Sequence, residues 1–192
     1  NVIEFLEAAK KAPDTLNLGR HVVVIGGGNT AMDAARAAKR LPGVETVSLV
    51  YRRTRRYMPA DQEELELALA DGVEFRELLA PVGVRDGVLT CRVMELGAPD
   101  ATGRPAEVPA DTVITAVGEK VDTELYTANG LSVDQRGRAV VNPDTLESSV
   151  KHVFVVGDGQ KGPGTVVEAI AGATKAAKAI QAFDTEKYVE KN

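Results

Sequence analysis

Two periods of apolar residues alternate along the first part of the chain. In residues 2–9 the apolar positions lie three and four apart, which predicts a short amphipathic helix that ends before Pro13. Residues 21–25 and 46–51 are continuous β-branched apolar runs, typical of parallel strands buried on both faces. Between them, residues 29–41 carry an alanine-rich stripe that predicts a helix. This order predicts a right-handed βαβ unit.

The pattern changes to shorter elements after this unit. Asp61, followed by Glu64 at the capping-box position, predicts the start of a helix that ends at Gly72. Four short apolar runs follow, at residues 73–79, 81–84, 88–96 and 112–116. A reversal signal at residues 85–87 indicates that they form an antiparallel meander. Residues 97–109, rich in Gly, Pro, Ala and Asp, predict an exposed loop or a distorted hairpin.

A different organisation is expected beyond Gly118, where we place a domain boundary. Residues 139–141 and 153–156 predict strands, and the second run is apolar throughout, so that it needs cover on both faces. A helix is expected from about Thr165, with an apolar stripe formed by Val166, Ile170, Ala173, Ala177 and Ile180. The charged residues 184–192 predict a frayed tail.

Composition narrows the class of protein. With 192 residues, 44% hydrophobic and 27% charged, the chain is long and apolar enough for a globular α/β core. Its net charge of −5 provides no general basic field for nucleic acid, and no apolar run reaches the ~20 residues of a membrane span. We therefore expect a cytoplasmic protein with neither a nucleic-acid nor a membrane partner. Because the chain begins at Asn1 rather than Met, we also expect it to be part of a longer protein.

The strongest chemical signal is the turn between the first strand and its helix. Its residues are Gly26, Gly27, Gly28, Asn29, Thr30 and Ala31, the GxGxxA form of the dinucleotide fingerprint. Gly26 permits the tight turn, Gly28 lets a pyrophosphate approach the backbone, and Ala31 lets the helix lie close to the strand. The free N–H groups at the helix start favour an anion. All six residues are candidate cofactor ligands, although glycines can also serve a tight turn alone.

The end of the second strand indicates which nucleotide is bound. An NAD-binding unit places Asp or Glu there for the ribose hydroxyls, whereas this strand runs into Arg52 and Arg53. Guanidinium groups at that position suit a 2′-phosphate, which favours NADP(H). The alternative is a solvated basic loop, in which Arg55 and Arg56 also pair with acids on the surface.

Several motifs together resemble one family. They are GGGNTAMD at residues 26–33, Tyr51-Arg52-Arg53, Met58-Pro59, and GVEF at residues 72–75. In this order they resemble the NADPH-binding domain of the glutamate synthase small chain. The wider group includes dihydropyrimidine dehydrogenase and the flavoprotein subunits proposed for selenate reduction. The resemblance implies that the intact protein transfers hydride from NADPH to FAD and passes electrons to iron–sulfur clusters and a partner catalytic subunit.

The resemblance also implies a flavin-binding part near the C-terminus. Residues 115–118, ending in Gly118, resemble the crossing from the nucleotide domain to the flavin domain. Gly157 and Asp158 resemble the pair whose acid meets the ribityl chain of the flavin, and the helix start at Thr165 and Val166 would face its ring. A Gly-Asp-Gly sequence after a strand is often only a turn.

Departures from the family pattern bear on what this chain can do alone. It lacks the βαβ unit that holds the FAD adenosine, and its single cysteine, Cys91, excludes a cysteine-ligated iron–sulfur cluster within the chain. Glu119, Lys120 and Val121 differ from the family, and we assign them no role. The chain then corresponds to the second half of such a flavoprotein, expected to bind NADP(H) but not FAD by itself. Self-association through residues after Gly118 is expected unless they fold back on the first domain.

Other candidate residues have simpler explanations. His21 and His152 flank strands, Cys91 fits a small core position, and Asp33 can compensate the helix dipole. We assign no catalytic residue and no metal site. The predicted fold is α/β: a lead-in helix and linker (1–18), a Rossmann-like NAD(P)H-binding domain with an antiparallel meander (19–118), and a C-terminal strand and helix of an FAD-binding domain (119–192).

Two other functions share part of this pattern, and the first of them stays open. The chain can be an NADP-binding regulatory module that catalyses nothing; an upstream sequence with a second GxGxxG and cysteines would distinguish the two. A disulfide reductase of the thioredoxin reductase type has the same domain order, but it requires a CxxC that this chain lacks.

Overall fold

The parallel strands and their connecting helix form where the apolar pattern predicts them. In the computed structural model, which describes the backbone of residues 1–95, 98–99, 103–118 and 121–189, the chain divides into two units, Asn1–Val117 and Gly118–Asn192. The predicted division into residues 1–18, 19–118 and 119–192 concerns domains defined by their ligands and stays a prediction.

The first unit contains three α-helices, two short 3-10 helices and two small sheets among its described residues. The helical elements are α1 (Val2–Lys11), η1 (Pro13–Thr15), α2 (Asn29–Lys39), η2 (Arg55–Tyr57) and α3 (Gln62–Ala70). The strands are β1 (His21–Gly26), β2 (Thr46–Tyr51), β3 (Glu74–Glu77), β4 (Leu79–Arg85), β5 (Val88–Glu95), β6 (Ala98–Pro99), β7 (Pro105–Pro109) and β8 (Thr112–Ala116).

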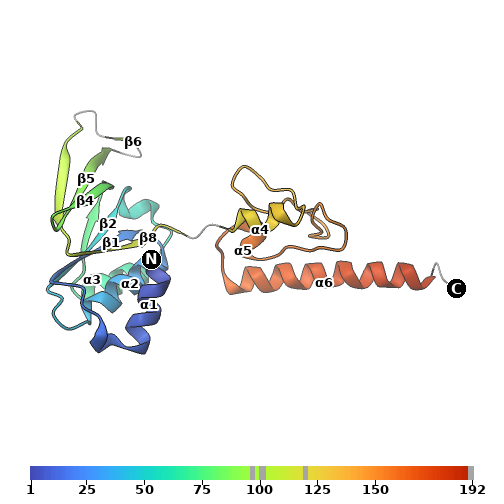
Figure 1. Ribbon diagram of the computed structural model, residues 1–192, viewed down its shortest axis with the longest axis horizontal. Coiled ribbons are helices and arrows are strands. Elements are labelled where there is room, and N and C mark those ends of the chain that lie inside the picture. The colour runs from blue at the N-terminus through green and yellow to red at the C-terminus, as the bar shows by residue number, and fades with distance from the viewer. Residues whose placement is uncertain (96–97, 100–102, 119–120, 190–192) are drawn as a thin grey trace. The chain divides into compact units, whose positions relative to one another are not determined.

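A four-stranded parallel sheet forms the centre of this unit, in the order β3-β2-β1-β8. β1 pairs in parallel with β2, from His21–Thr46 to Ile25–Val50, and with β8 on its other side. The helices α1, α2 and α3 lie on one face of the sheet, and β4 and β5 lie on the other (Figure 1). The sheet is therefore covered on both faces, as its continuous apolar strands require.

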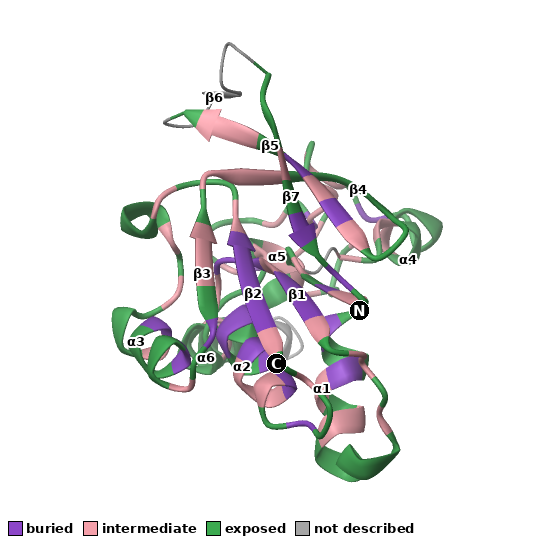
Figure 2. Cartoon of the chain, turned by 90° about the vertical axis from the view of Figure 1, so that its left-hand side faces the viewer, coloured by how far each residue is buried: buried purple, intermediate pink, exposed green. Residues whose placement is uncertain are grey.

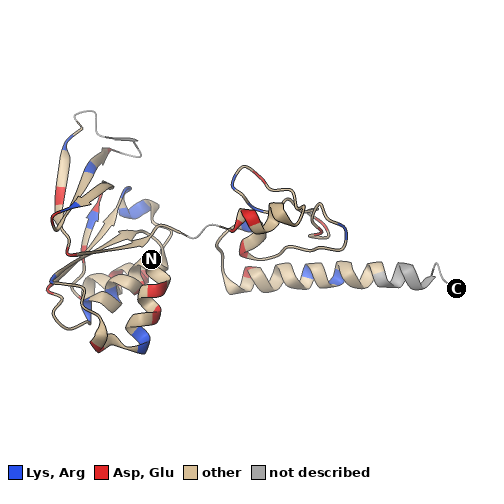
Figure 3. Ribbon diagram, viewed as in Figure 1, with Lys and Arg blue, Asp and Glu red and all other residues tan. Residues whose placement is uncertain are grey.

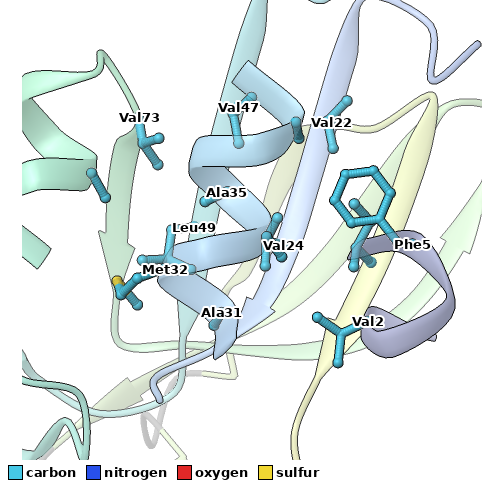
Figure 4. Close-up of a cluster of buried hydrophobic side chains, with 14 of the residues drawn as sticks. Val2, Phe5, Val22, Val24, Ala31, Met32, Ala35, Val47, Leu49 and Val73 are labelled. Atoms are coloured by element: carbon cyan, nitrogen blue, oxygen red, sulfur yellow. The ribbon is translucent and has the colours of Figure 1, made fainter. Parts of the chain in front are cut away.

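Side chains of β1 alternate between two hydrophobic clusters. Val22 and Val24 pack with the helices, whereas Val23 packs with residues of the antiparallel sheet. The buried positions of β1 and β2 lie between these layers (Figure 2). Figure 4 shows Phe5 of α1 and Met32 of α2 within the helical cluster. The N-terminal helix is thus part of the core of this unit.

The prediction that residues 73–79 and 112–116 belong to the antiparallel meander was wrong. β3 pairs in parallel with β2, and β8 pairs in parallel with β1, so both belong to the parallel sheet. The meander consists of β4 and β5 with β7, which pairs antiparallel with β5. A short apolar run shows that a strand is buried but not which neighbour it pairs with. β6 and β7 lie within residues 97–109, where we expected a loop or distorted hairpin; residues 97 and 100–102 lie outside the described part.

The start of α3 also differs from the capping box that the sequence predicts. Asp61 occupies the N-cap position, but its side chain does not bond to the helix N–H groups. Its carboxylate instead accepts a hydrogen bond of 3.0 Å from the Asn29 side chain. Glu64 does not reach back to the Asp61 N–H, which donates to Asn29 Oδ1; it lies 3.6 Å from Arg36 of α2. Tertiary contacts have thus replaced the local cap.

The second unit is built from helices and irregular segments. Its helices are α4 (Thr123–Ala128), α5 (Asp158–Lys161) and α6 (Val166–Val189). A small cluster of buried residues comprises Leu131, Ala139 and Val155, with Tyr126 packed against it. Residues 139–141 and 153–156, where we expected strands, form isolated bridges only: Val133–Ala139, Val141–Ser148 and Glu147–Phe154. Backbone pairing needs a neighbouring strand, and the described part of this unit provides single bridges.

Helix α6 begins close to the predicted position and continues into the predicted frayed tail as far as Val189; residues 190–192 of that tail lie outside the described part. Its expected apolar stripe is exposed, with Val166 76% and Ile170 60% accessible. The helix packs through a neighbouring stripe of small residues instead. Ala176 is buried, and Gly172 lies so close to Leu146 and Val156 that a side chain there would be in contact with both. Figure 3 shows few charges on the part of this helix that is coloured by residue type.

Candidate functional site

The glycine turn lies at the carboxyl end of β1, between β2 and β8. Gly26 closes the strand with φ +157°, and a Cβ at this residue would overlap the carbonyl oxygen of Ala116 in β8. The same Cβ would be 3.0 Å from Cβ of Ala31, which is fully buried. Gly26 and Ala31 are therefore small because strand and helix pack closely here.

Gly27 lacks a side chain for a different reason. The ring of Tyr51, the last residue of β2, occupies the space that a Cβ of Gly27 would need. The Tyr51 hydroxyl donates a hydrogen bond of 2.7 Å to the carbonyl of Tyr57, which fixes the ring. Our sequence analysis assigned no role to this tyrosine; its place directly before the two arginines was the available signal.

Gly28 has neither of these constraints. Its backbone is extended, with φ −97° and ψ 172°, a conformation that any residue adopts. No described atom lies within 4 Å of the position that its Cβ would occupy. The absence of a side chain thus leaves open space at the start of α2, where the N–H groups of Asn29 and Thr30 have no partner among the described residues. This geometry fits a phosphate group.

The side chain of Asn29 is already engaged within the protein. Its amide donates to Asp61 and its oxygen accepts from the Asp61 N–H at 2.9 Å. As a predicted cofactor ligand, Asn29 therefore has its backbone N–H to offer rather than its side chain. Thr30 follows it on the exposed side of the helix start.

Arg52 and Arg53 directly follow the end of β2, and both residues are exposed to solvent. Neither side chain has a hydrogen bond or ion pair within the described part of the chain, and the same holds for Arg56. Arg55, the first residue of η2, pairs with Glu66 at 3.2 Å, and its N–H donates to Glu77. The alternative of a basic loop neutralised by neighbouring acids thus applies to Arg55 and leaves three guanidinium groups available.

Three of the five candidate residues in the second unit lie around one pocket. Gly157, Asp158 and Thr165 line a pocket of about 570 Å³ together with Lys161 and Glu168. Gly118, with φ +101°, and Val166 are not among the lining residues. The Asp158 carboxylate accepts from the N–H of Gly164 at 3.2 Å, so it is turned toward its own loop.

A capping box that the sequence analysis missed closes the start of α6. Thr165 and Glu168 bond reciprocally: Glu168 N–H donates to Thr165 Oγ1 at 3.2 Å, and Glu168 Oε2 accepts from Thr165 N–H at 2.8 Å. The Glu168 carboxylate accepts hydrogen bonds from both the N–H and the hydroxyl of Thr165, and these hold the pKa of the carboxyl below its usual value. The signal was the spacing Thr-x-x-Glu before an apolar run.

Other titratable residues have structural partners. His21 Nδ1 lies 2.9 Å from Thr46 Oγ1, and the His152 ring meets Phe183 edge-on. Cys91 is buried, and burial raises the pKa of its thiol. No group of three metal-ligating side chains occurs among the described residues. Within that same part of the chain, no helix is long and apolar enough to cross a membrane.

A parallel sheet whose carboxyl edge combines a glycine turn, an open helix start and unpaired arginines is typical of dinucleotide-binding α/β proteins. The chain belongs to the pyridine nucleotide-disulphide oxidoreductase family, whose model matches residues 2–173. Cys91 is the single cysteine of this sequence, so the 192 residues cannot form a disulfide among themselves.

Curated relatives agree with this assignment. The chain is 49% identical over 174 residues to the putative oxidoreductase YgfK of Escherichia coli K12, covering 86% of this chain and 17% of that protein. It is 38% identical over 185 residues to the NADPH glutamate synthase small chain of Azospirillum brasilense, covering 88% and 38%. The NADPH-Fe(3+) oxidoreductase subunit beta of Geobacter sulfurreducens is 37% identical over 216 residues, with 93% and 32% covered. The predicted resemblance to the glutamate synthase small chain is confirmed, although this chain spans well under half of each relative.

Solved structures confirm the α/β fold class. Thioredoxin reductase of T. acidophilum matches with a TM-score of 0.70 at 21% identity, over 88% of this chain and 54% of that one. FprA from Mycobacterium tuberculosis, solved in complex with NADPH, matches with a TM-score of 0.66 at 18% identity, over 90% and 54%. At these identities the likeness concerns the fold alone.

Proposed function

We propose that this chain binds NADP(H) at the glycine turn and forms the nucleotide-binding part of a flavin-dependent oxidoreductase. The observation that carries the proposal is Gly28, which lacks a side chain although neither its backbone conformation nor its packing requires this. The open space beside it lies at a helix start, and unpaired arginines follow the adjacent strand. These groups match the pyrophosphate and the 2′-phosphate of one ligand.

Each part of the site has a separate role in this proposal. Gly28 and the N–H groups of Asn29 and Thr30 bind the pyrophosphate. Arg52 and Arg53 bind the 2′-phosphate through charge-assisted hydrogen bonds, which distinguish NADP(H) from NAD(H). NADPH supplies a hydride when bound, and the protein supplies position and electrostatics. We assign no side chain of this chain as a general acid or base.

In its finer form the proposal follows the relatives. The whole protein would transfer hydride from NADPH to FAD and pass electrons to iron–sulfur clusters outside this chain or to a partner subunit. Relatives named as a small chain and as a subunit beta support a partner. We assign Gly118, Gly157, Asp158, Thr165 and Val166 to the flavin side, supported by the pocket that three of them line.

The test is the replacement of both candidate arginines. Arg52→Ala with Arg53→Ala should weaken NADP(H) binding by roughly 2–4 kcal/mol, because two charge-assisted contacts are lost. Binding of NAD(H) should change little. Isothermal titration calorimetry with both nucleotides measures the difference.

A matched control removes the same number of charges elsewhere. Arg85 and Arg136 are exposed, and their alanine double variant has the same net charge as the test variant. It should bind both nucleotides as the unchanged chain does. Equal loss of NADP(H) and NAD(H) in the test variant would refute the 2′-phosphate assignment. An NADP(H)-binding chain whose full-length protein contains no flavin would instead support the regulatory-module alternative.

A further inference from the structure

The two halves of the proposed nucleotide site come from separate stretches of sequence. The glycine turn belongs to residues 26–31, and the free guanidinium groups belong to residues 52–61, which we call the arginine segment. A ligand that touches both halves requires a fixed distance between them. The contacts that join the arginine segment to the glycine turn therefore bear on affinity, even where they do not touch the ligand.

The segment is fastened beside the glycine turn by three backbone and side-chain contacts. The N–H of Ala60 donates to the carbonyl of Gly27 at 3.0 Å. The side-chain amide of Asn29 donates to the Asp61 carboxylate at 3.0 Å, and Asn29 Oδ1 accepts from the Asp61 N–H at 2.9 Å. Asn29 directly follows Gly28, so this reciprocal pair acts on the residue next to the open space.

The opposite end of the segment is held independently. Tyr51, which precedes it, donates to the Tyr57 carbonyl, and the Arg55 N–H donates to Glu77 of β3 at 2.8 Å. The segment is thus a strap that is attached at both ends and carries unpaired Arg52, Arg53 and Arg56.

The hydrogen bonds between Asn29 and Asp61 do not serve as a helix cap for α3. Asp61 stands at the N-cap position of α3, where a carboxylate usually bonds to the helix N–H groups, yet it faces Asn29 instead. A carboxylate beside a phosphate site weakens phosphate binding unless a hydrogen-bond donor offsets its charge. The Asn29 amide donates a hydrogen bond to this carboxylate and so offsets part of its charge, and the carboxylate makes no bond to the helix N–H groups of α3.

We propose that Asn29 and Asp61 are positioning residues that set the distance between the glycine turn and the arginine segment. This rests on the proposed function and specifies how the site selects its ligand. NADP+ spans both halves and should depend on the pair, whereas NAD+, which has no 2′-phosphate, should depend on it much less. Selectivity for NADP+ is then a property of the pair as well as of the arginines.

The experiment exchanges the partners. Asn29→Asp places two carboxylates face to face and adds a negative charge beside the pyrophosphate that NAD+ and NADP+ share, so both nucleotides should bind less tightly. Because NADP+ also depends on the arginine segment, its affinity should fall about tenfold more than that of NAD+. The double variant Asn29→Asp with Asp61→Asn restores a complementary pair, in which the side-chain amide at position 61 is the donor, and keeps the net charge of the unchanged chain. It should return the ratio of NADP+ to NAD+ affinity to within about threefold of that of the unchanged chain. Asp61→Ala, which loses one hydrogen bond, should show the same selective loss.

Calorimetry with NADP+ and with NAD+, alongside thermal unfolding, decides between the outcomes. Recovery in the double variant supports the inference, because a merely structural effect on α2 would lower binding of both nucleotides together. Equal losses for both nucleotides, or no recovery in the double variant, would overturn it. If Arg52 and Arg53 prove essential while all pair variants bind normally, the inference fails and the proposed function stands. If the unchanged chain shows no preference for NADP+, the proposed function fails first.

Discussion

Gly26, Gly27 and Gly28 lack side chains for three different physical reasons. Gly26 makes room for the Ala116 carbonyl, Gly27 makes room for the Tyr51 ring, and Gly28 faces open space. The first two reasons concern the stability of the protein, and the third concerns a ligand. Neighbouring residues of one motif should therefore respond differently to the same substitution.

Gly28→Val should abolish NADP(H) binding and leave the fold intact. Valine adopts the extended backbone of Gly28 without strain, and its side chain would fill the space proposed for the pyrophosphate. Circular dichroism and a binding titration on the same sample measure both effects. Retained binding would refute the role of this turn.

Gly26→Val serves as the contrasting variant. Here the valine would overlap the Ala116 carbonyl and take a positive φ, so we expect a loss of about 2–4 kcal/mol in the free energy of unfolding. Urea unfolding followed by circular dichroism measures this loss. A normal unfolding midpoint for this variant would contradict the packing explanation.

The glycine motif could be predicted from the sequence, but its individual constraints could not. Gly26 depends on Ala116, a residue far along the chain whose strand returns to β1. Asp61 and Glu64 matched a local capping pattern, yet Asp61 bonds to Asn29, which is 32 positions away. Local patterns report what a residue can do among its neighbours in sequence, and tertiary contacts decide among the possibilities.

At the scale of elements, helices and strands with long, clear periods were predicted best. β2 begins and ends where its apolar run does, and α2 begins at the predicted residue. The parallel pairing of β3 with β2 and of β8 with β1 was missed. A five-residue apolar run such as β8 has the same appearance in a parallel and an antiparallel sheet. In α6, residues 166–180 are so rich in alanine, valine and isoleucine that their period does not single out the packed face.

A loop of the second unit should determine part of its response to acid. Asp134 accepts hydrogen bonds from the Arg138 side chain at 2.6 and 2.9 Å, and Arg138 also donates to the Lys161 carbonyl of α5. These bonds lower the pKa of the Asp134 carboxyl to about 2. In the unfolded chain its pKa is about 3.9, so its contribution to stability is complete above pH ~4 and is lost as the pH falls toward ~2.

The Asp134→Asn variant should therefore be less stable than the unchanged chain at about pH 4. This difference in stability should shrink as the pH falls from ~4 to ~2. Thermal unfolding followed by circular dichroism at a series of pH values measures the difference. Arg138→Ala removes the partner and should show the same convergence. A difference that stays constant over this range would show that the ion pair does not contribute through titration.

At the scale of the whole molecule, helix α6 carries several exposed large apolar side chains. Val166, Val167, Ile170 and Ile180 are all exposed on this helix. Contiguous apolar side chains in water favour association. We expect the 192-residue chain to self-associate through residues after Gly118 and to purify without flavin colour.

Ile170→Lys should weaken this association, because a charge within the apolar face must stay solvated. Sedimentation velocity at several protein concentrations measures the change. Gln135→Lys, an exposed position in a loop of the same unit, adds the same charge and should leave association unchanged. A strict monomer at all concentrations, or a yellow preparation with stoichiometric flavin, would contradict the prediction.

The return of β8 to β1 also has a consequence for the order of folding. Asp111, just before β8, accepts hydrogen bonds from the N–H groups of Arg20 and His21, and Arg20 lies 91 positions earlier in the sequence. Closing such a long loop is slow compared with forming a βαβ connection. Since Gly26 packs against Ala116 of β8, the glycine turn reaches its final shape only after that strand has docked. During refolding from urea, the capacity to bind NADP+ should therefore appear in the slowest phase, after most of the helical signal has recovered.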